Sequence, residues 1–247
     1  MKIIVIIPTY NERETIVDLI DDLEAEFQKI LKHEFGILIV DGNSPDGTAA
    51  AVNQKKQIYQ NIDLIIEKEK RGLGIAYLTG IRYAIDVLKA GAFIEFDGDF
   101  QHNPVDIKRL IAEFDKGYDC VIGSRYVPGG KVPEKWALYR KLLSKYGSLF
   151  IKFVLSLPTN DNTSGLKLSR VKNFAERLPL DEDKILSRRH AYKIHLLYEM
   201  VKMGAKIKEI PIEFLERGGG SSKSSLEDIL ESLRVVFILF LKKFKHD

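Results

Sequence analysis

The 247-residue sequence contains one cysteine and no long apolar run. The lone Cys120 excludes an intrachain disulfide and a metal site built from several cysteines. The longest uncharged apolar run, Val235 to Leu241, is far shorter than the roughly 20 residues of a membrane-spanning helix. The run Ile3 to Ile7 is shorter than a signal-peptide core. We therefore expect a chain that neither crosses a bilayer by itself nor is secreted by that route.

The sequence also has little excess charge. A net charge of +3 is too small to favour nucleic acid as a partner. Hydrophobic residues make up 45% and charged residues 30%, as in an ordinary soluble globular protein. This length is enough for one large domain with a sizeable core, or for one domain with an appendage.

Short apolar runs alternate with helical patterns in the first half of the chain. Strands are predicted at Lys2–Ile7, Phe35–Val40, Ile62–Ile66, Ala92–Phe96 and Cys120–Ile122. Helices are predicted between them, at about Glu12–Leu31, Thr48–Tyr59, Gly74–Leu88 and Pro104–Phe114. This alternation, with strands that are apolar almost throughout, predicts a mainly parallel sheet covered by helices on both faces.

The second half of the chain is less regular. Helices are predicted at Trp136–Leu155 and His190–Met203, with a loop at Pro158–Gly165 and an apolar stretch at Lys206–Leu215. A glycine-rich joint then precedes apolar residues at helical spacing from Leu226 onward. We therefore expect one domain over residues 1–217, followed over residues 218–247 by a flexible joint and an amphipathic helix.

Polar clusters follow four of the five predicted strands. They begin at Pro8, Asp41, Asp97 and Gly123. In parallel sheets, ligands bind beyond the carboxyl ends of the strands, so the four clusters are expected along one rim. Four such coincidences favour a binding site over four independent turns.

The third of these clusters carries metal-binding side chains. Residues two apart on an extended strand share a face, so Asp97, Asp99 and Gln101 are expected to converge. Three oxygen donors suit Mg²⁺ or Mn²⁺. The alternative is a solvated turn, because Asp and Gly are ordinary loop residues.

These clusters, in this order, resemble the family 2 glycosyltransferases of the GT-A fold, and within them the dolichyl-phosphate (polyprenyl-phosphate) mannose synthases. The strings that carry the resemblance begin at residues 8, 41, 97, 123, 163 and 217, so they span nearly the whole chain. The chain departs from the family pattern at Gly42, Gly98, Asn162 and Leu166. The first two departures leave the aspartates in place, and the last two lie near the expected acceptor loop.

The resemblance implies a hexose transfer from a nucleoside diphosphate to a lipid phosphate, with inversion at the anomeric carbon. It implies a Mg²⁺ or Mn²⁺ ion on Asp97, Asp99 and Gln101. The implied nucleotide-sugar residues are Pro8, Tyr10, Glu12, Asp41, Asp97, Gly98, Asp99, Arg217 and Lys223. The implied acceptor-phosphate residues are Arg125, Arg140 and Ser144, and those expected to take part in catalysis are Asp99, Arg217 and Arg125.

The chemistry of the acceptor agrees with what the sequence offers. A phosphate monoester is already largely dianionic at neutral pH, so it needs positioning and charge neutralisation more than a general base. The planar guanidinium of arginine suits that task, although an exposed helical charge is the alternative for Arg140. His102 is expected beside the metal site or at the surface, and His195 in the core.

A lipid-phosphate acceptor requires contact with a membrane. The amphipathic segment that ends at Lys242, Lys243 and Lys245 has basic residues for anionic headgroups and phenylalanines for the acyl boundary. The alternatives are a helix packed on the domain's own core, or a handle for a separate membrane-spanning subunit. We expect a peripheral enzyme on the cytosolic face of a membrane.

The reaction that we expect converts GDP-mannose and dolichyl phosphate into dolichyl β-phosphomannose and GDP. One alternative keeps the reaction but uses UDP-glucose as donor. Another is a transferase with a hydroxyl acceptor, which needs a general base. A third is a non-catalytic nucleotide-sugar-binding module, which the intact Asp97, Asp99, Gln101 and Arg217 disfavour.

Overall fold

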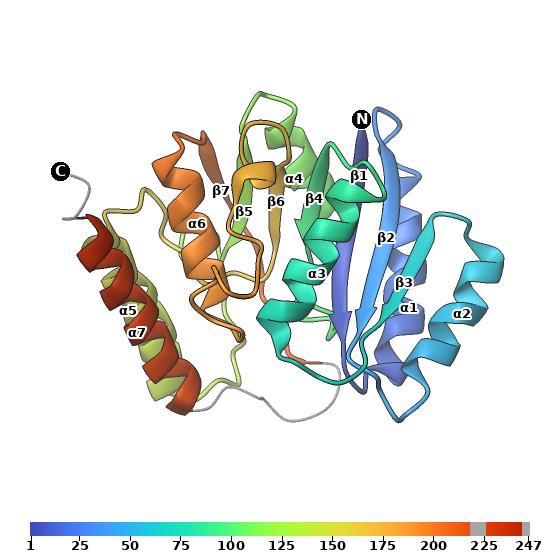
Figure 1. Ribbon diagram of the computed structural model, residues 1–247, viewed down its shortest axis with the longest axis horizontal. Helices are drawn as coiled ribbons and strands as arrows, with labels where there is room; N and C mark the ends of the chain where they lie inside the picture. Colours follow the sequence, from blue (N-terminus) through green and yellow to red (C-terminus); the bar gives the residue numbers. More distant parts are fainter. Residues whose placement is uncertain (218–225, 244–247) are drawn as a thin grey trace.

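The computed structural model describes residues 1–217 and 226–243, and within them helices cover both faces of a seven-stranded sheet (Figure 1). The strands are β1 (Lys2–Thr9), β2 (Glu34–Asp41), β3 (Ile62–Ile66), β4 (Ala92–Glu95), β5 (Cys120–Ser124), β6 (Lys167–Arg170) and β7 (Ile207–Pro211). The α-helices are α1 (Arg13–Phe27), α2 (Thr48–Ile58), α3 (Leu73–Asp86), α4 (Asp106–Phe114), α5 (Leu138–Leu155), α6 (Tyr192–Lys202) and α7 (Leu226–Lys243). A 3₁₀ turn, Ala175–Arg177, precedes α6.

The strands lie in the order β3-β2-β1-β4-β6-β5-β7. β1 pairs in parallel with β2 and β4, β2 with β3, and β5 with β7, whereas β6 runs antiparallel to β4 and β5. This confirms the predicted mainly parallel sheet. The carboxyl ends of β1, β2 and β4 therefore meet at one edge, with the segment that enters β6 beside them.

Alternation along the strands divides the core between the two faces of the sheet. Ile3, Val5 and Ile7 of β1 pack with α1, α2 and α4. Ile4 and Ile6 point the other way and pack with α3 and α6, as the two-residue side-chain period of a strand requires. Burial on both faces explains why these strands read as continuous apolar runs rather than as alternating ones.

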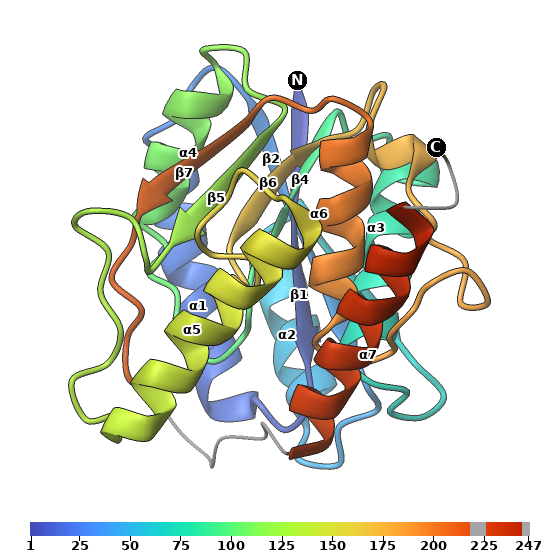
Figure 2. The same cartoon turned by 90° about the vertical axis from the view of Figure 1, so that its left-hand side faces the viewer.

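α5 and α7 form an outer layer beside α6 (Figure 2). One face of α7 packs against α5 and α6 and buries Val235, Val236 and Leu239. Phe237, on the other side of the helix, is exposed. Arg189 forms an ion pair with Asp228 near the start of α7. One face of α7 therefore packs on the domain, and another remains open.

The glycine at position 80 sets the distance between α3 and the sheet. A Cβ at Gly80 would lie 2.5 Å from Ile6 Cγ2 and 3.2 Å from Val40 Cγ2. The helix therefore packs directly on β1 and β2 at this point, and the chain before α3 is held close to the carboxyl end of β1.

We predict that Gly80→Ala lowers the free energy of unfolding by about 1–3 kcal/mol, because the added methyl group overpacks a full core. Denaturant unfolding measures this change. Gly147→Ala on α5 is the matched control, since no atom lies within 4 Å of the added Cβ. It should stabilise the protein by about 0.5–1 kcal/mol through helix propensity alone. Equal effects of the two substitutions would contradict the tight α3–sheet contact.

Candidate active site

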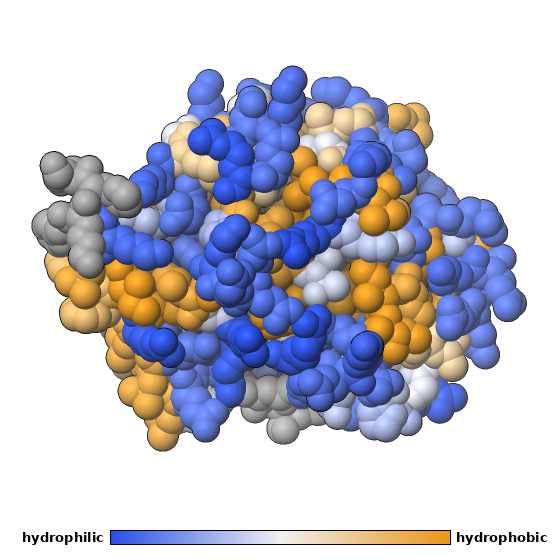
Figure 3. All heavy atoms as spheres, viewed as in Figure 1, coloured by the Kyte–Doolittle hydropathy of each residue, from blue (hydrophilic) through white to orange (hydrophobic). Residues whose placement is uncertain are grey.

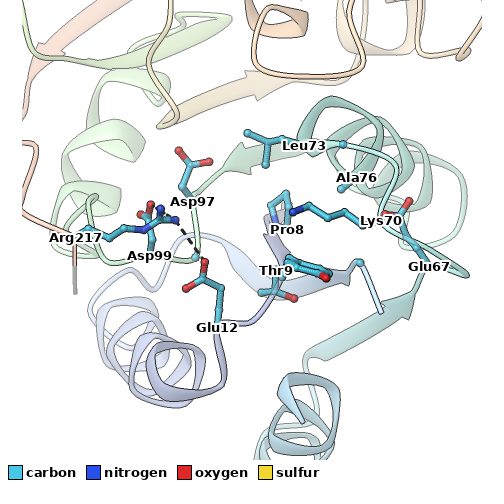
Figure 4. Close-up of a pocket in the computed structure, with 14 residues that line it drawn as sticks. Pro8, Thr9, Glu12, Glu67, Lys70, Leu73, Ala76, Asp97, Asp99 and Arg217 are labelled. Atoms are coloured by element: carbon cyan, nitrogen blue, oxygen red, sulfur yellow. Dashed lines mark hydrogen bonds and ion pairs between the residues drawn. The ribbon is translucent and has the colours of Figure 1, made fainter. Parts of the chain in front are cut away.

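A pocket opens at the edge where β1, β2 and β4 end (Figure 4). Its walls come from the loop after β1, the loop that enters α3, the turn after β4 and Arg217. The lining residues are Pro8, Thr9, Tyr10, Glu12, Gly42, Glu67, Lys70, Gly72, Leu73, Ala76, Asp97, Gly98, Asp99 and Arg217. Seven of the nucleotide-sugar residues named from the sequence are among them: Pro8, Tyr10, Glu12, Asp97, Gly98, Asp99 and Arg217.

The carboxylate of Asp97 is surrounded by donors and cations. The hydroxyl of Tyr77 donates to Asp97 Oδ1 at 2.7 Å. Asp97 Oδ2 lies 3.6 Å from Lys193 Nζ and 3.7 Å from His102 Nε2. Burial alone raises the pKa of the Asp97 carboxyl, but Lys193, followed by His102 and Tyr77, lowers this pKa well below its usual value. Asp97 is therefore ionised at the pocket wall.

The carboxylate of Asp99 is paired with Arg217. Arg217 Nη2 lies 3.1 Å from Asp99 Oδ2 and 3.5 Å from Glu12 Oε1, as Figure 4 shows. Burial and the negative charge of Asp97 raise the pKa of Asp99, and Arg217 partly offsets this. One guanidinium therefore bridges two carboxylates, one from the turn after β4 and one from the loop after β1.

Gln101 lies outside the pocket, unlike the prediction. β4 ends at Glu95 and the chain turns at Gly98–Asp99, with Phe100 at φ 60°. The extended geometry that would have placed Asp97, Asp99 and Gln101 on one face is therefore absent. The Gln101 side chain instead donates from Nε2 to the Leu215 carbonyl at 3.2 Å.

Asp41 also differs from its predicted role at the nucleotide. Its carboxylate is fully buried and accepts hydrogen bonds from the Thr9 hydroxyl and from the backbone and hydroxyl of Ser44. These contacts tie the end of β2 to the end of β1. Asp41 is not among the residues that line the pocket, and its contacts hold together the two strand ends beside it.

The expected acceptor-phosphate residues are not among the residues that line the pocket. Arg125 donates from Nε and Nη2 to the buried carboxylate of Asp161, each at 2.7 Å, and from Nη2 to Thr163. The fork that was expected to grip a phosphate is thus directed at Asp161. Burial raises the pKa of Asp161, but Arg125 outweighs it and lowers that pKa below its usual value.

Ser144 and Arg140 lie on the first half of α5. The Ser144 hydroxyl shares a hydrogen bond with Tyr126, whose ring lies 5.1 Å from the Arg125 guanidinium carbon. The Arg140 guanidinium stacks on Trp136 at 4.0 Å from the ring centre. Lys223, the remaining predicted residue, lies outside the described residues.

Three charged residues at or near the pocket, Glu67, Lys70 and Lys193, were not singled out from the sequence. Glu67 and Lys70 line it, and Lys70 Nζ lies 3.9 Å over the Tyr10 ring. Lys193 reaches Asp97 from α6, about a hundred residues further along the chain. No local motif marks any of the three. For Lys193, a lysine in a helical pattern is ordinarily interpreted as a surface charge.

The two histidines discussed in the sequence analysis are both buried. His195 lies in the core, as predicted. His102 is 1% exposed, and neither ring nitrogen has a hydrogen-bond partner. Its ring packs edge-on against Phe96 and Phe214. The predicted surface position of His102 is therefore wrong. Its place beside Asp97 agrees with the alternative, a position beside the proposed metal site.

The donor set suits a metal held by few protein ligands. Within residues 1–217 and 226–243, no three His, Cys, Asp or Glu side chains converge as a metal cluster. Asp97 and Asp99 nevertheless both face the pocket, and the orphaned nitrogens of His102 lie behind Asp97. Two carboxylates at an open pocket fit a hard divalent cation that takes its other ligands from a bound diphosphate and water.

The chain is similar to known glycosyltransferases. The family model "Glycosyl transferase family 2" matches residues 4–178. The polyprenol monophosphomannose synthase of Mycolicibacterium smegmatis is 34% identical over 94% of this chain and 84% of that protein. The undecaprenyl-phosphate mannosyltransferase of Micrococcus luteus is 34% identical over 91% and 88%.

The fold is similar to a solved mannosyltransferase from Pyrobaculum calidifontis in complex with GDP-Man and Mn²⁺. The TM-score is 0.56, at 17% identity, over 99% of this chain and 64% of that one. At this identity the likeness concerns the fold alone. It agrees with the GT-A fold that the sequence resemblance implied.

Gly165 provides the space that the Asp97 carboxylate occupies. A Cβ there would lie 2.0 Å from Asp97 Oδ2 and 2.8 Å from His102 Nε2. We predict that Gly165→Ala displaces Asp97 and weakens metal-dependent nucleotide binding by at least about tenfold, a loss of about 1.4 kcal/mol. Titration calorimetry with GDP and Mn²⁺ measures this.

Gly123→Ala is the control for the Gly165 variant. It makes the same change on the neighbouring strand β5, where the added Cβ meets only Ile212 and Leu166 side chains at 3.0 Å or more. Nucleotide binding by this control should stay near wild type while its thermal stability falls. Normal GDP binding by a folded Gly165→Ala protein would show that Asp97 does not need its observed position.

Proposed function

Because this chain belongs to glycosyl transferase family 2, we propose that it is a polyprenyl-phosphate mannosyltransferase. In the reaction we propose, GDP-mannose and a polyprenyl phosphate such as dolichyl phosphate give polyprenyl β-phosphomannose and GDP, with inversion at the anomeric carbon. The observation that carries the proposal is the acidic pair Asp97 and Asp99 on a pocket wall, with Arg217 beside Asp99. The names of the two relatives supply the mannose and the polyprenyl acceptor.

The divalent cation, Mg²⁺ or Mn²⁺, belongs to the proposal. Asp97 and Asp99 would hold it, and Gln101 would have to turn away from Leu215 to join them. When bound, the cation supplies charge neutralisation to the departing diphosphate. Arg217 adds a second positive charge on the same wall.

The nucleotide would occupy the part of the pocket between the β1 loop and the loop that enters α3. Tyr10 offers a flat aromatic surface for the base, and Lys70 lies over that ring. Glu12 and Glu67 are carboxylates on the lining, and each can accept hydrogen bonds from base or ribose. These contacts would hold the donor with its diphosphate toward Asp99 and Arg217.

The acceptor phosphate needs charge neutralisation and orientation rather than deprotonation. Arg125, Tyr126 and Ser144 form a connected group beside the pocket, with Arg140 one helical turn from Ser144. We assign the acceptor phosphate to this group. Arg125 is held in place by Asp161, so its guanidinium would act from a fixed position.

We predict that the purified protein transfers mannose from GDP-mannose to dolichyl phosphate in detergent only with Mg²⁺ or Mn²⁺. Asp99→Asn should lower turnover at least about 100-fold, because it removes a charge that would hold the cation. The control Asp18→Asn, on the exposed face of α1, should retain full turnover. Transfer of radiolabelled sugar to the lipid fraction, with and without chelator, measures both.

UDP-glucose is tested as the donor in parallel with GDP-mannose in the same assay. Product from UDP-glucose alone would reject the donor and retain the reaction class. Metal-dependent GDP binding without product from either donor would favour the non-catalytic binding module. Undiminished turnover in the folded Asp99→Asn protein would reject the metal assignment.

A lipid acceptor also requires a surface that meets the membrane, and we infer that α5 and α7 supply it. Their exposed apolar residues are Leu138, Tyr139, Leu142, Leu143, Tyr146, Leu149, Phe150 and Phe153 on α5, and Leu226, Leu230, Leu233, Phe237 and Leu241 on α7. Figure 3 shows hydrophobic surface over these two helices. No helix in the described part of the chain has the length and hydropathy to span a bilayer.

This surface extends the predicted interfacial segment from α7 to α5. The lysines at the end of α7 and Lys145 on α5 are exposed beside it and would meet anionic headgroups. The proposal places the enzyme peripherally on the cytosolic face of a membrane. The alternative is that a separate membrane-spanning subunit covers this surface of α5 and α7.

We predict that the double variant Phe153→Asp/Phe237→Asp binds vesicles of phosphatidylglycerol and phosphatidylcholine at least about tenfold more weakly than wild type. Each phenylalanine is mostly exposed, at 71% and 61%, and loses apolar contact with lipid when replaced. GDP binding should be unchanged. Leu31→Asp, at a 93% exposed site in the α1–β2 loop, is the control. Equal loss in this control, or no loss in the double variant, would contradict the assignment.

A further inference from the structure

Lys193 of α6 is a buried lysine beside the acidic wall of the pocket. It is 5% exposed, and its Nζ lies 3.6 Å from Asp97 Oδ2. An ammonium group removed from water is costly unless a partner offsets its charge. Lys193 and Asp97 therefore each offset the charge of the other.

The neighbours of Lys193 direct its charge to Asp97. The rings of Tyr77 and Tyr192 lie 5.8 and 5.9 Å from its Nζ and provide aromatic faces. The other buried carboxylate nearby, Glu95, already has Lys167 at 2.9 Å and the Tyr192 hydroxyl at 2.7 Å. In the described part of the chain, Asp97 is the one carboxylate within 4.0 Å of Lys193 Nζ.

The two carboxylates of the proposed metal site thus each face a cation of the protein. Lys193 lies beside Asp97, and Arg217 lies beside Asp99. A divalent cation placed between Asp97 and Asp99 would bring two positive charges close to Lys193 and Arg217, which already offset the charges of these carboxylates. Repulsion between like charges a few ångströms apart is large in a partly buried site. The negative charge of a diphosphate would remove that imbalance.

We propose that Lys193 is the resident counter-ion of Asp97 and weakens the site for a bare divalent cation, so that the cation enters together with the nucleotide diphosphate. This inference rests on the metal site of the proposed function. Lys193 acts through Asp97 and is a positioning residue, because it does not line the pocket.

The test measures binding of Mn²⁺ alone, by the electron paramagnetic resonance signal of the free ion, to wild type and to Lys193→Met. Methionine has a similar length without the charge. We expect Lys193→Met to bind bare Mn²⁺ about tenfold tighter or more, because the like charge is gone. Lys193→Arg, which keeps the charge, should stay within about twofold of wild type.

Lys108→Met on the exposed face of α4 is the control for net charge, and it should also stay within about twofold. Thermal melts report whether each variant is folded. If Lys193→Met does not fold, wild type still tests the second half of the proposal. Its affinity for bare Mn²⁺ should be at least about tenfold weaker than its affinity for Mn²⁺ with GDP.

Two results would overturn the inference alone. One is Lys193→Met binding bare Mn²⁺ no tighter than wild type, and the other is wild type binding Mn²⁺ equally well without GDP. A weaker affinity in Lys193→Met would make Lys193 an aid to metal binding instead. Absence of Mn²⁺ binding to wild type, even with GDP, would reject the metal site of the proposed function together with this inference.

Discussion

The carboxylate of Asp97 is confined by groups from four separate parts of the chain, and the pocket depends on that confinement. Tyr77, Lys193 and His102 approach its oxygens, and Gly165 leaves the space that it occupies. The antiparallel strand β6 explains the last contact. In the β4–β6 register Glu95 lies opposite Lys167, so two residues further on Asp97 faces Gly165. A parallel strand at this position would have brought a different part of the chain to the site.

The sheet thus combines two ways of bringing residues to one edge. The parallel strands β1, β2 and β4 end together and place their loops side by side. β6 enters from the same edge because it runs the other way, and it brings Asp161 and Thr163, which hold Arg125. The side of the pocket proposed for the nucleotide is built by the parallel strands, and the side proposed for the acceptor is built around β6.

Much of this arrangement could be predicted because it depends on short-range patterns. The five early strands match their predicted positions to within two residues at each end. For β1 and β2 the reason is burial on both faces, which leaves long apolar runs. Pro8 lies near the end of β1, and Tyr10, Glu12 and Asp99 lie shortly after the ends of β1 and β4, so the rule for strand ends places them at the pocket.

The side chains whose observed contacts differ from the expected ones have partners within the protein that the sequence pattern does not reveal. Asp41 and Gln101 were expected to contact ligands, but Thr9 with Ser44, and Leu215, provide their hydrogen bonds inside the protein. Arg125 likewise has Asp161 as its partner. Lys193 was missed for the same reason, because only the tertiary fold reveals that a helical lysine faces an aspartate. Residue type and spacing indicate what a side chain is able to bind, and long-range packing decides which partner it has.

For the proposed acceptor this packing matters most at α5, which carries Ser144 next to Tyr126 and exposed apolar residues such as Phe153. If a lipid chain lay along that exposed surface, its phosphate would therefore be held by the same helix that we propose to contact the membrane.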